Sequence, residues 1–160
     1  MPYYFFDTSA IVKRYVQEKG STWVRGICEQ RDPGTDRRQH VIFIGELAWI
    51  EVAAAITKRV KRTRDLNQEE GYKAYDLFSK HARDEYQVVP WTGILIGSAV
   101  AMVQNHALRA YDAVQLALAL HANNALKESD LFLTFVTSDK ALLQAAQAEG
   151  LAAENPQDHT

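Results

Sequence analysis

The stretch Tyr3-Tyr4-Phe5-Phe6-Asp7-Thr8-Ser9 places four aromatic residues directly before an aspartate and two hydroxyl residues. Four consecutive aromatic residues have the length and composition of a short buried strand. Asp7 is therefore expected at the carboxyl end of that strand, where α/β sheets bind their ligands. Asp7 is equally suited to cap the helix that should follow, and the two roles stay open.

Four more short apolar segments, each separated from the next by helical sequence, repeat this arrangement at residues 41–44, 86–89, 131–136 and 151–153. Helices are expected after Asp7 as far as Gly20, from Ser21 onward, and over residues 45–59, 68–83, 94–105, 110–123 and 140–149. The alternation predicts an α/β fold: a central parallel sheet of four to five strands, flanked by helices on both faces. We expect one domain over residues 1–154 and a frayed tail over residues 155–160.

Composition excludes several classes of protein. An apolar fraction of 47% with 24% charged residues argues against wholesale disorder. No run of about 18 apolar residues and no basic leader are found, so neither a membrane span nor a signal peptide is expected. Cys28 is the only cysteine, which rules out an internal disulfide and a cysteine-based zinc site. A cytoplasmic location is the resulting expectation.

Three further acids stand out by their surroundings. Glu51 is the only charged residue between Leu47 and Ile56, which predicts a buried helix in which a carboxylate needs a proton, an ion pair or a metal. Asp112 opens a similarly apolar helix, where it could instead stabilise the helix dipole. Asp139 follows the segment 131–136 as Asp7 follows its own strand, and it too could be a helix cap.

Together these four acids predict a metal site. Two stand at strand ends and two on helices that can flank those ends. Carboxylates about 4 Å apart repel by roughly 4 kcal/mol at an effective dielectric of 20, so clustering requires compensation. Mg²⁺ or Mn²⁺ is the expected ion, because both prefer carboxylate and water oxygens.

Four segments of the chain resemble the four motifs of the PIN domain, and most closely those of VapC-type toxins of toxin–antitoxin pairs. They are residues 4–13, 46–52, 108–117 and 135–151. Gly45 departs from the pattern, since these proteins often carry Ser or Thr there. The resemblance implies a PIN-like fold and a Mg²⁺- or Mn²⁺-dependent endoribonuclease. It also implies an RNA substrate, a homodimer and a cognate antitoxin that covers the site.

The resemblance implies catalytic and metal-binding roles for Asp7, Glu51, Asp112 and Asp139. Ser9 and Thr137 could supply hydroxyls that hold the carboxylates or a water molecule. The candidates for contact with the phosphates of RNA, each of which could equally be an ordinary surface residue, are Lys13, Arg14, Arg109 and Lys140.

Two other classes of function are open. A PIN-like scaffold can act as a non-catalytic binding module through its partners. A phosphatase or phospho-acceptor on a similar sheet is disfavoured, because Ser9 stands where a dehalogenase-type enzyme needs its second acid and no paired acids precede Asp7. The net charge of −2 decides nothing about nucleic acid, although basic residues cluster at 58–64 and at 37–38. The sequence does not name the RNA target.

Overall fold

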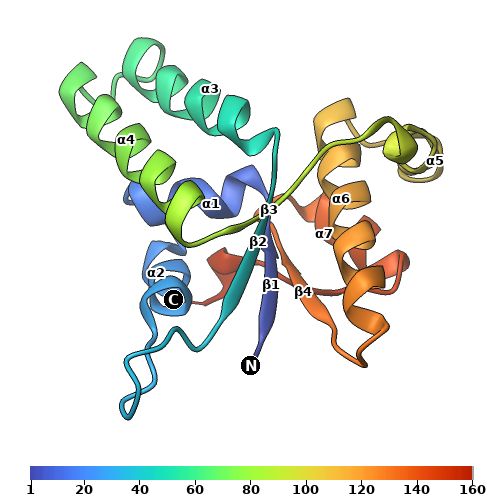
Figure 1. The fold of residues 1–160 in the computed structure, drawn as a ribbon. Helices are drawn as coiled ribbons and strands as arrows, with labels where there is room; N and C mark the ends of the chain where they lie inside the picture. Colours follow the sequence, from blue (N-terminus) through green and yellow to red (C-terminus); the bar gives the residue numbers. More distant parts are fainter. Residues whose placement is uncertain (160) are drawn as a thin grey trace.

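The computed structural model describes residues 1–159. Its centre is a parallel sheet with the strand order β3-β2-β1-β4-β5 (Figure 1). The strands are β1 (Tyr3–Phe6), β2 (Val41–Gly45), β3 (Gln87–Val89), β4 (Leu133–Val136) and β5 (Ala152–Glu154). The predicted fold class, with a parallel sheet between two layers of helices, is confirmed.

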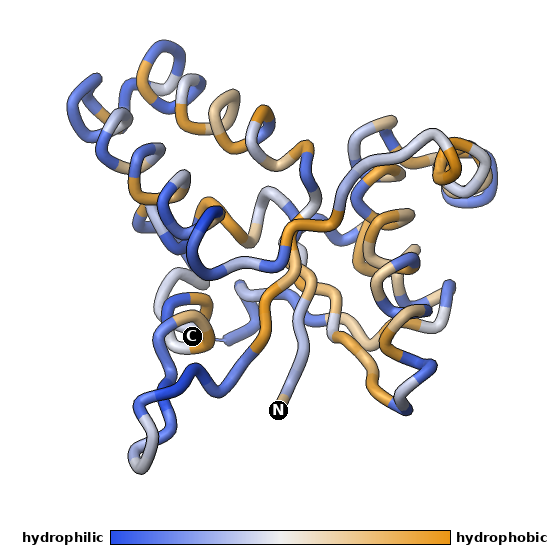
Figure 2. The backbone as a smooth tube through the Cα atoms, in the orientation of Figure 1, coloured by the Kyte–Doolittle hydropathy of each residue, from blue (hydrophilic) through white to orange (hydrophobic). Residues whose placement is uncertain are grey.

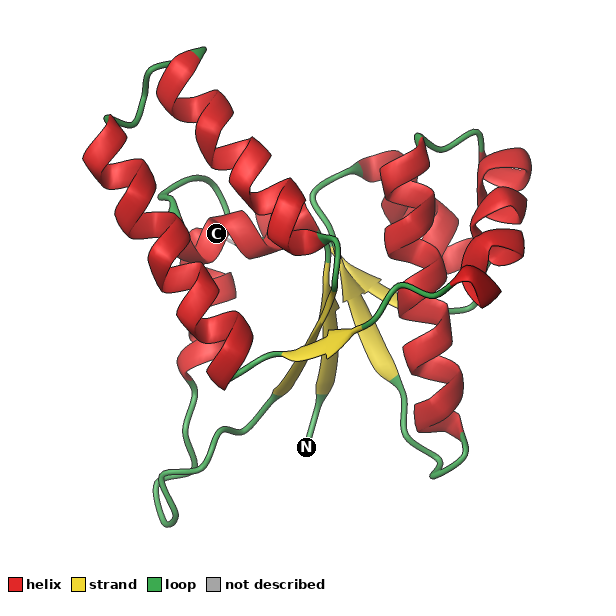
Figure 3. Ribbon diagram, turned by 45° about the horizontal axis from the view of Figure 1, so that its top comes forward, coloured by secondary structure: helices red, strands yellow, loops and turns green. Residues whose placement is uncertain are grey.

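The helices divide into two groups, one on each face of the sheet (Figure 3). One group is α1 (Thr8–Tyr15), α2 (Ser21–Glu29), α3 (Ala48–Lys61) and α4 (Gln68–Asp84). The other is α5 (Ile96–His106), α6 (Ala110–Lys127) and α7 (Lys140–Ala148), and short 3₁₀ turns span Gly93–Leu95 and Pro156–Asp158. No helix within residues 1–159 has the length and apolar character that crossing a membrane requires.

Strand β1 is the central strand and is buried on both faces. Phe5 packs toward α5–α7, where its ring stacks on Phe135 with centroids 5.8 Å apart. Phe6 points to the opposite face and packs in the core formed with α1–α4. Burying each phenyl ring contributes about 2–3 kcal/mol. The aromatic run that opens the chain therefore reflects a strand without a solvent-facing side.

The strand order reverses at β1, which fixes the position of the crevice. The chain leaves β1 toward β2 on one side and later returns as β4 on the other. At the carboxyl ends of the pair, the backbone N–H of Asp7 donates to the carbonyl of Val136 at 3.1 Å. A switch point of this kind opens a crevice at the carboxyl ends of the strands. The functional residues predicted at strand ends fall at this place.

Helix α3 differs from the prediction. It begins at Ala48 rather than near residue 45, because Gly45 still pairs with Val89 in the sheet and the Glu46 carboxylate accepts a hydrogen bond from the backbone N–H of Trp91 at 2.8 Å. The expectation of a helix buried on all sides is wrong. Ile50 is 61% exposed and lies on the outer face of α3.

The expectation of a frayed tail is also wrong for residues 155–159. Asn155 is buried and its side chain accepts a hydrogen bond from the backbone N–H of Gln157 at 2.9 Å. The ring of His159 stacks on Trp23 of α2 with centroids 4.2 Å apart. A surface tryptophan thus supplies the packing partner that the sequence alone did not reveal. Thr160 lies outside the described residues.

Candidate active site

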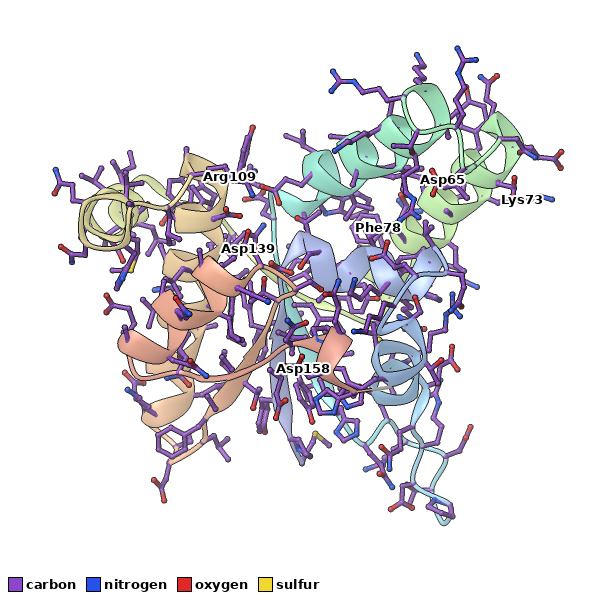
Figure 4. All side chains as sticks on the ribbon, turned by 180° about the vertical axis from the view of Figure 1, so that it is seen from behind. Asp65, Lys73, Phe78, Arg109, Asp139 and Asp158 are labelled. Atoms are coloured by element: carbon purple, nitrogen blue, oxygen red, sulfur yellow. The ribbon has the colours of Figure 1, made fainter. Side chains whose placement is uncertain are left out.

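All four acids singled out in the sequence line one cleft at the carboxyl ends of β1 and β4, with a volume of about 680 Å³. Figure 4 shows Arg109 and Asp139 on one side of this region and Asp65, which lines the far end of the cleft, on the other. The remaining lining residues are Asp7, Thr8, Ser9, Val12, Glu18, Glu51, Ala55, Lys58, Arg59, Thr63, Asp112 and Gln115.

Asp7 both caps a helix and faces the cleft. Its Oδ1 accepts hydrogen bonds from the backbone N–H of Ala10 at 2.9 Å, as the N-cap of α1, and from the Ser9 hydroxyl at 2.6 Å. Its Oδ2 accepts a hydrogen bond from the Thr137 hydroxyl at 2.5 Å. The two hydroxyls singled out in the sequence thus donate to one carboxylate. Asp7 can therefore cap α1 and take part in the site at the same time.

Asp139 divides its oxygens between two tasks. Oδ1 caps α7 by accepting a hydrogen bond from the backbone N–H of Leu142 at 2.9 Å. Oδ2 lies 3.5 Å from the Arg109 guanidinium, which also donates to Asp112 at 3.2 Å. The Arg109 side chain is 82% exposed, so this cation bridges the two acids from the solvent side.

Glu51 is held from two other elements. Its Oε2 accepts hydrogen bonds from the hydroxyl of Thr8, on α1, and from the amide of Gln115, on α6, the latter at 3.0 Å. The carboxylate is therefore held at one oxygen, and the other oxygen, Oε1, is buried without a hydrogen-bond partner among residues 1–159.

Burial in the cleft favours the neutral forms of three of its acids, Asp7, Glu51 and Asp112. Burial, which outweighs the hydrogen bonds from Ser9, Thr137 and the Ala10 N–H, raises the pKa of Asp7 to about 6, with a further contribution from the charge of Asp112. Burial also raises the pKa of Glu51 and the pKa of Asp112. These acids thus lie where positive charge would stabilise their ionised forms.

The fit to a divalent cation rests on this chemistry. No group of three or more His, Cys, Asp or Glu side chains within the described chain converges tightly enough to form a ready metal site. The four carboxylates nevertheless share one cleft, and the orphaned Oε1 of Glu51 lacks the positive partner that a buried carboxylate oxygen requires. An oxygen-only donor set of this kind suits Mg²⁺ or Mn²⁺.

Two of the four residues expected to contact RNA, Lys13 and Arg14, do not face solvent, and their contacts favour a structural role. Lys13 is buried and pairs with Glu18 at 2.6 Å. Arg14 is buried, donates to Glu85 at 2.9 Å and to the Tyr86 hydroxyl at 2.8 Å, and so ties α1 to the end of α4. Both side chains lie on a helix whose buried stripe the sequence pattern did not resolve.

The other two expected RNA contacts are exposed. Arg109 lines the cleft, whereas Lys140, the first residue of α7, is exposed but does not line it. An additional cation, Lys58 on α3, lies at the cleft wall and forms no ion pair within residues 1–159. Lys58 was visible in the sequence only as part of a basic cluster.

Sequence reasoning missed two polar residues at the site, Thr8 and Gln115. Gln115 carried a signal, because it is the one polar residue between Ala113 and Leu120 on a helix that is otherwise apolar there. A single amide in such a segment needs hydrogen-bond partners.

The chain is similar in fold to a protein of known structure. In structure, the chain is similar to one in the crystal structure of VapBC2 from Rickettsia felis bound to a DNA fragment from their promoter, with a TM-score of 0.56, 13% identity, and coverage of 96% of this chain and 98% of that chain. A domain of a functionally unknown protein from Methanocaldococcus jannaschii gives a TM-score of 0.48 at 15% identity, covering 97% and 91% of the two chains. No curated protein sequence matches significantly. The model of the PIN domain family matches residues 4–148, and the chain therefore belongs to the PIN domain family.

Proposed function

We propose that this protein is a Mg²⁺- or Mn²⁺-dependent endoribonuclease. The single observation that carries the proposal is the meeting of four acids, drawn from distant parts of the chain, in one cleft at the switch point of the sheet. Membership of the PIN domain family, whose members are typically nucleases, supports the same conclusion.

In the proposed mechanism Asp7, Glu51, Asp112 and Asp139 would hold the cation. When bound, a divalent cation lowers the pKa of a coordinated water and neutralises charge on the phosphate. The hydroxyls of Ser9 and Thr137 keep the Asp7 carboxylate oriented, and Thr8 does the same for Glu51. Arg109, which pairs with Asp112 and Asp139 from the solvent side, would exchange these acids for a phosphate group of the bound RNA.

We further propose that the protein acts as the toxin of a toxin–antitoxin pair, with an antitoxin as partner, and that it forms a homodimer. The VapBC2 likeness supports the first part at the level of the fold. Exposed apolar side chains support the second: the segment around α5 is apolar in Figure 2, and Ile94, Ile96, Val100 and Tyr111 are all exposed there. Light scattering on the purified chain measures the oligomeric state directly.

The nuclease proposal is tested by incubating purified protein with structured RNAs in Mn²⁺, in Mg²⁺ and in EDTA. We expect cuts that require the metal and that disappear in an Asp112→Asn variant purified in the same way. Equal cutting by both proteins would identify a contaminant. No cutting by the wild type in either metal would favour the non-catalytic binding module instead.

A further inference from the structure

The side-chain amide of Gln115 is a buried polar group that has no role in the mechanism proposed above. Gln115 lies on α6, one turn after Asp112, is 2% exposed and lines the acidic cleft. Its Nε2 donates to Oε2 of Glu51 at 3.0 Å, whereas its Oε1 is buried without a hydrogen-bond partner in the described chain. An amide whose oxygen is buried without a partner is costly, which points to a role at the cleft that offsets this cost.

The two oxygens of Glu51 are used unequally. Both protein donors, the Thr8 hydroxyl and the Gln115 amide, reach Oε2, and Oε1 receives none from residues 1–159. Because the donors come from α1 and α6, the carboxylate is clamped between helices on opposite faces of the sheet. A carboxylate clamped at one oxygen presents the other in a fixed direction.

Gly45, the last residue of β2, lies next to this amide and has no side chain that would collide with it. A Cβ atom at this position would lie 3.2 Å from Oε1 of Gln115 and 2.8 Å from Cδ1 of Leu118. A larger residue would therefore require the amide or the leucine to move. The position of the Gln115 amide therefore depends on glycine at residue 45.

We propose that Gln115 is the positioning residue of Glu51: its amide fixes Oε2 so that Oε1 faces a divalent cation in the cleft. The proposal rests on the proposed metal-dependent function and names the group that orients one of its ligands. Partners of this kind typically change metal affinity by about 10–100-fold when they are removed. An apolar residue at 115 would leave Thr8 as the only remaining donor to Glu51 within residues 1–159.

The test is calorimetric titration of Mn²⁺ into the wild type and into a Gln115→Leu variant, without RNA. We expect the dissociation constant to rise by about 10–100-fold in the variant while its circular dichroism spectrum stays native. Gly45→Ala, which keeps the amide but crowds it, is expected to weaken binding in the same direction. This second variant also serves if Gln115→Leu does not fold.

The matched control is Asn123→Ala. Asn123 is another buried amide on α6, but its Oδ1 accepts a hydrogen bond from the backbone N–H of Leu133, away from the cleft. This variant is expected to lose stability and to keep the wild-type affinity for Mn²⁺. A loss of affinity equal to that of Gln115→Leu would show a general packing effect and overturn the proposal.

A double-mutant cycle with Glu51→Gln separates the proposal from its premise. If Gln115 acts through Glu51, Gln115→Leu should cause no further loss of Mn²⁺ affinity in the Glu51→Gln background. Full additivity, or a folded Gln115→Leu variant with wild-type affinity, would refute the positioning role alone. A wild type that binds no Mn²⁺ at all would refute both this role and the proposed function.

Discussion

The hydroxyl of Thr137, just beyond β4, donates to the carboxylate of Asp7, just beyond β1, at 2.5 Å across 130 residues of sequence. This hydrogen bond joins the carboxyl ends of the two strands that flank the switch point. It also fixes the acid that is most deeply buried among the four. The same hydrogen bond thus connects two strands of the sheet and orients a carboxylate of the site.

Replacing Asp7 with Asn should abolish metal-dependent cleavage and yet stabilise the metal-free protein at neutral pH. The rise of the Asp7 pKa from 3.8 to about 6 corresponds to an ionised form that is destabilised by at most about 3 kcal/mol in the fold. Asn keeps the helix cap without the buried charge. Urea unfolding in EDTA should show a gain of about 1–3 kcal/mol at pH 7.5.

The sign of this effect depends on pH. Because the folded pKa of Asp7 is raised, its contribution to stability is fully present below about pH 4 and is lost as the pH rises through about 6. The advantage of Asp7→Asn should therefore shrink toward zero near pH 4. A variant that is less stable than the wild type at pH 7.5 would contradict the assigned burial cost.

Metal binding should weaken as the pH falls below about 6. Protons compete with the cation for Asp7, and the raised pKa values of Glu51 and Asp112 add to the competition. We expect the dissociation constant for Mn²⁺ to rise by about tenfold or more for each pH unit below 6. Titrations between pH 5 and 7.5 measure this, and a flat profile would contradict the participation of Asp7.

Removing Arg109 should tighten metal binding. Its guanidinium lies 3.2 Å from Asp112 and 3.5 Å from Asp139, where it competes with a divalent cation for the same oxygens. The side chain is largely exposed, so the competing ion pairs are worth only about 0.5–1 kcal/mol. Arg109→Gln should therefore lower the Mn²⁺ dissociation constant by about two- to fivefold; an increase would identify Arg109 as a support of the site.

Lys58 should contribute to RNA affinity. It is exposed at the cleft wall, about two turns after Glu51 on the same side of α3, at a distance of about 10 Å along the helix axis. Lys58→Ala should weaken RNA binding and reduce the slope of log affinity against log salt by about 0.7. Lys73→Ala is the matched control: Lys73 is exposed on α4 and pairs with Glu69 outside the cleft (Figure 4). Equal effects of both variants would indicate nonspecific charge.

Arg14 should matter for folding rather than for RNA. Its buried guanidinium bonds Glu85 and Tyr86, so Arg14→Ala removes one partner from each. Glu85 keeps its ion pair with Arg38, and Tyr86 keeps its hydrogen bond with Tyr15. Loss of one member of a buried ion pair costs about 3–5 kcal/mol when the other is left uncompensated, so a smaller loss of about 1–3 kcal/mol is expected here. Thermal unfolding should reveal that loss. A stable Arg14→Ala protein with weakened RNA binding would restore the sequence-based role.

The parts of the fold that follow from local pattern could be predicted. The sequence predicts β1 from its aromatic run and places Asp7 and Asp139 just beyond the ends of β1 and β4. This prediction is possible because a strand that is buried on both faces is apolar, so the first polar residue after it marks its carboxyl end. The placement of Glu51 in the same cleft was expected, although for a partly mistaken reason, since α3 exposes Ile50 on its outer face.

The parts that depend on long-range partners could not be predicted. Lys13 and Arg14 look like surface cations until the positions of Glu18 and Glu85 are known. The role of Gln115 becomes visible only when α6 is placed beside Glu51. Such pairings cannot be inferred from single residues, because they depend on how the helices pack against the sheet.

The anomalous difference density of crystals soaked in Mn²⁺ tests the proposed metal site most directly. We expect a Mn²⁺ peak in the cleft, in contact with Asp7 and at least one of Glu51, Asp112 and Asp139. The same peak should be absent from crystals of Asp7→Asn. A cleft without Mn²⁺ at millimolar concentration, or an unchanged peak in the variant, would contradict the claim that these acids form a metal site.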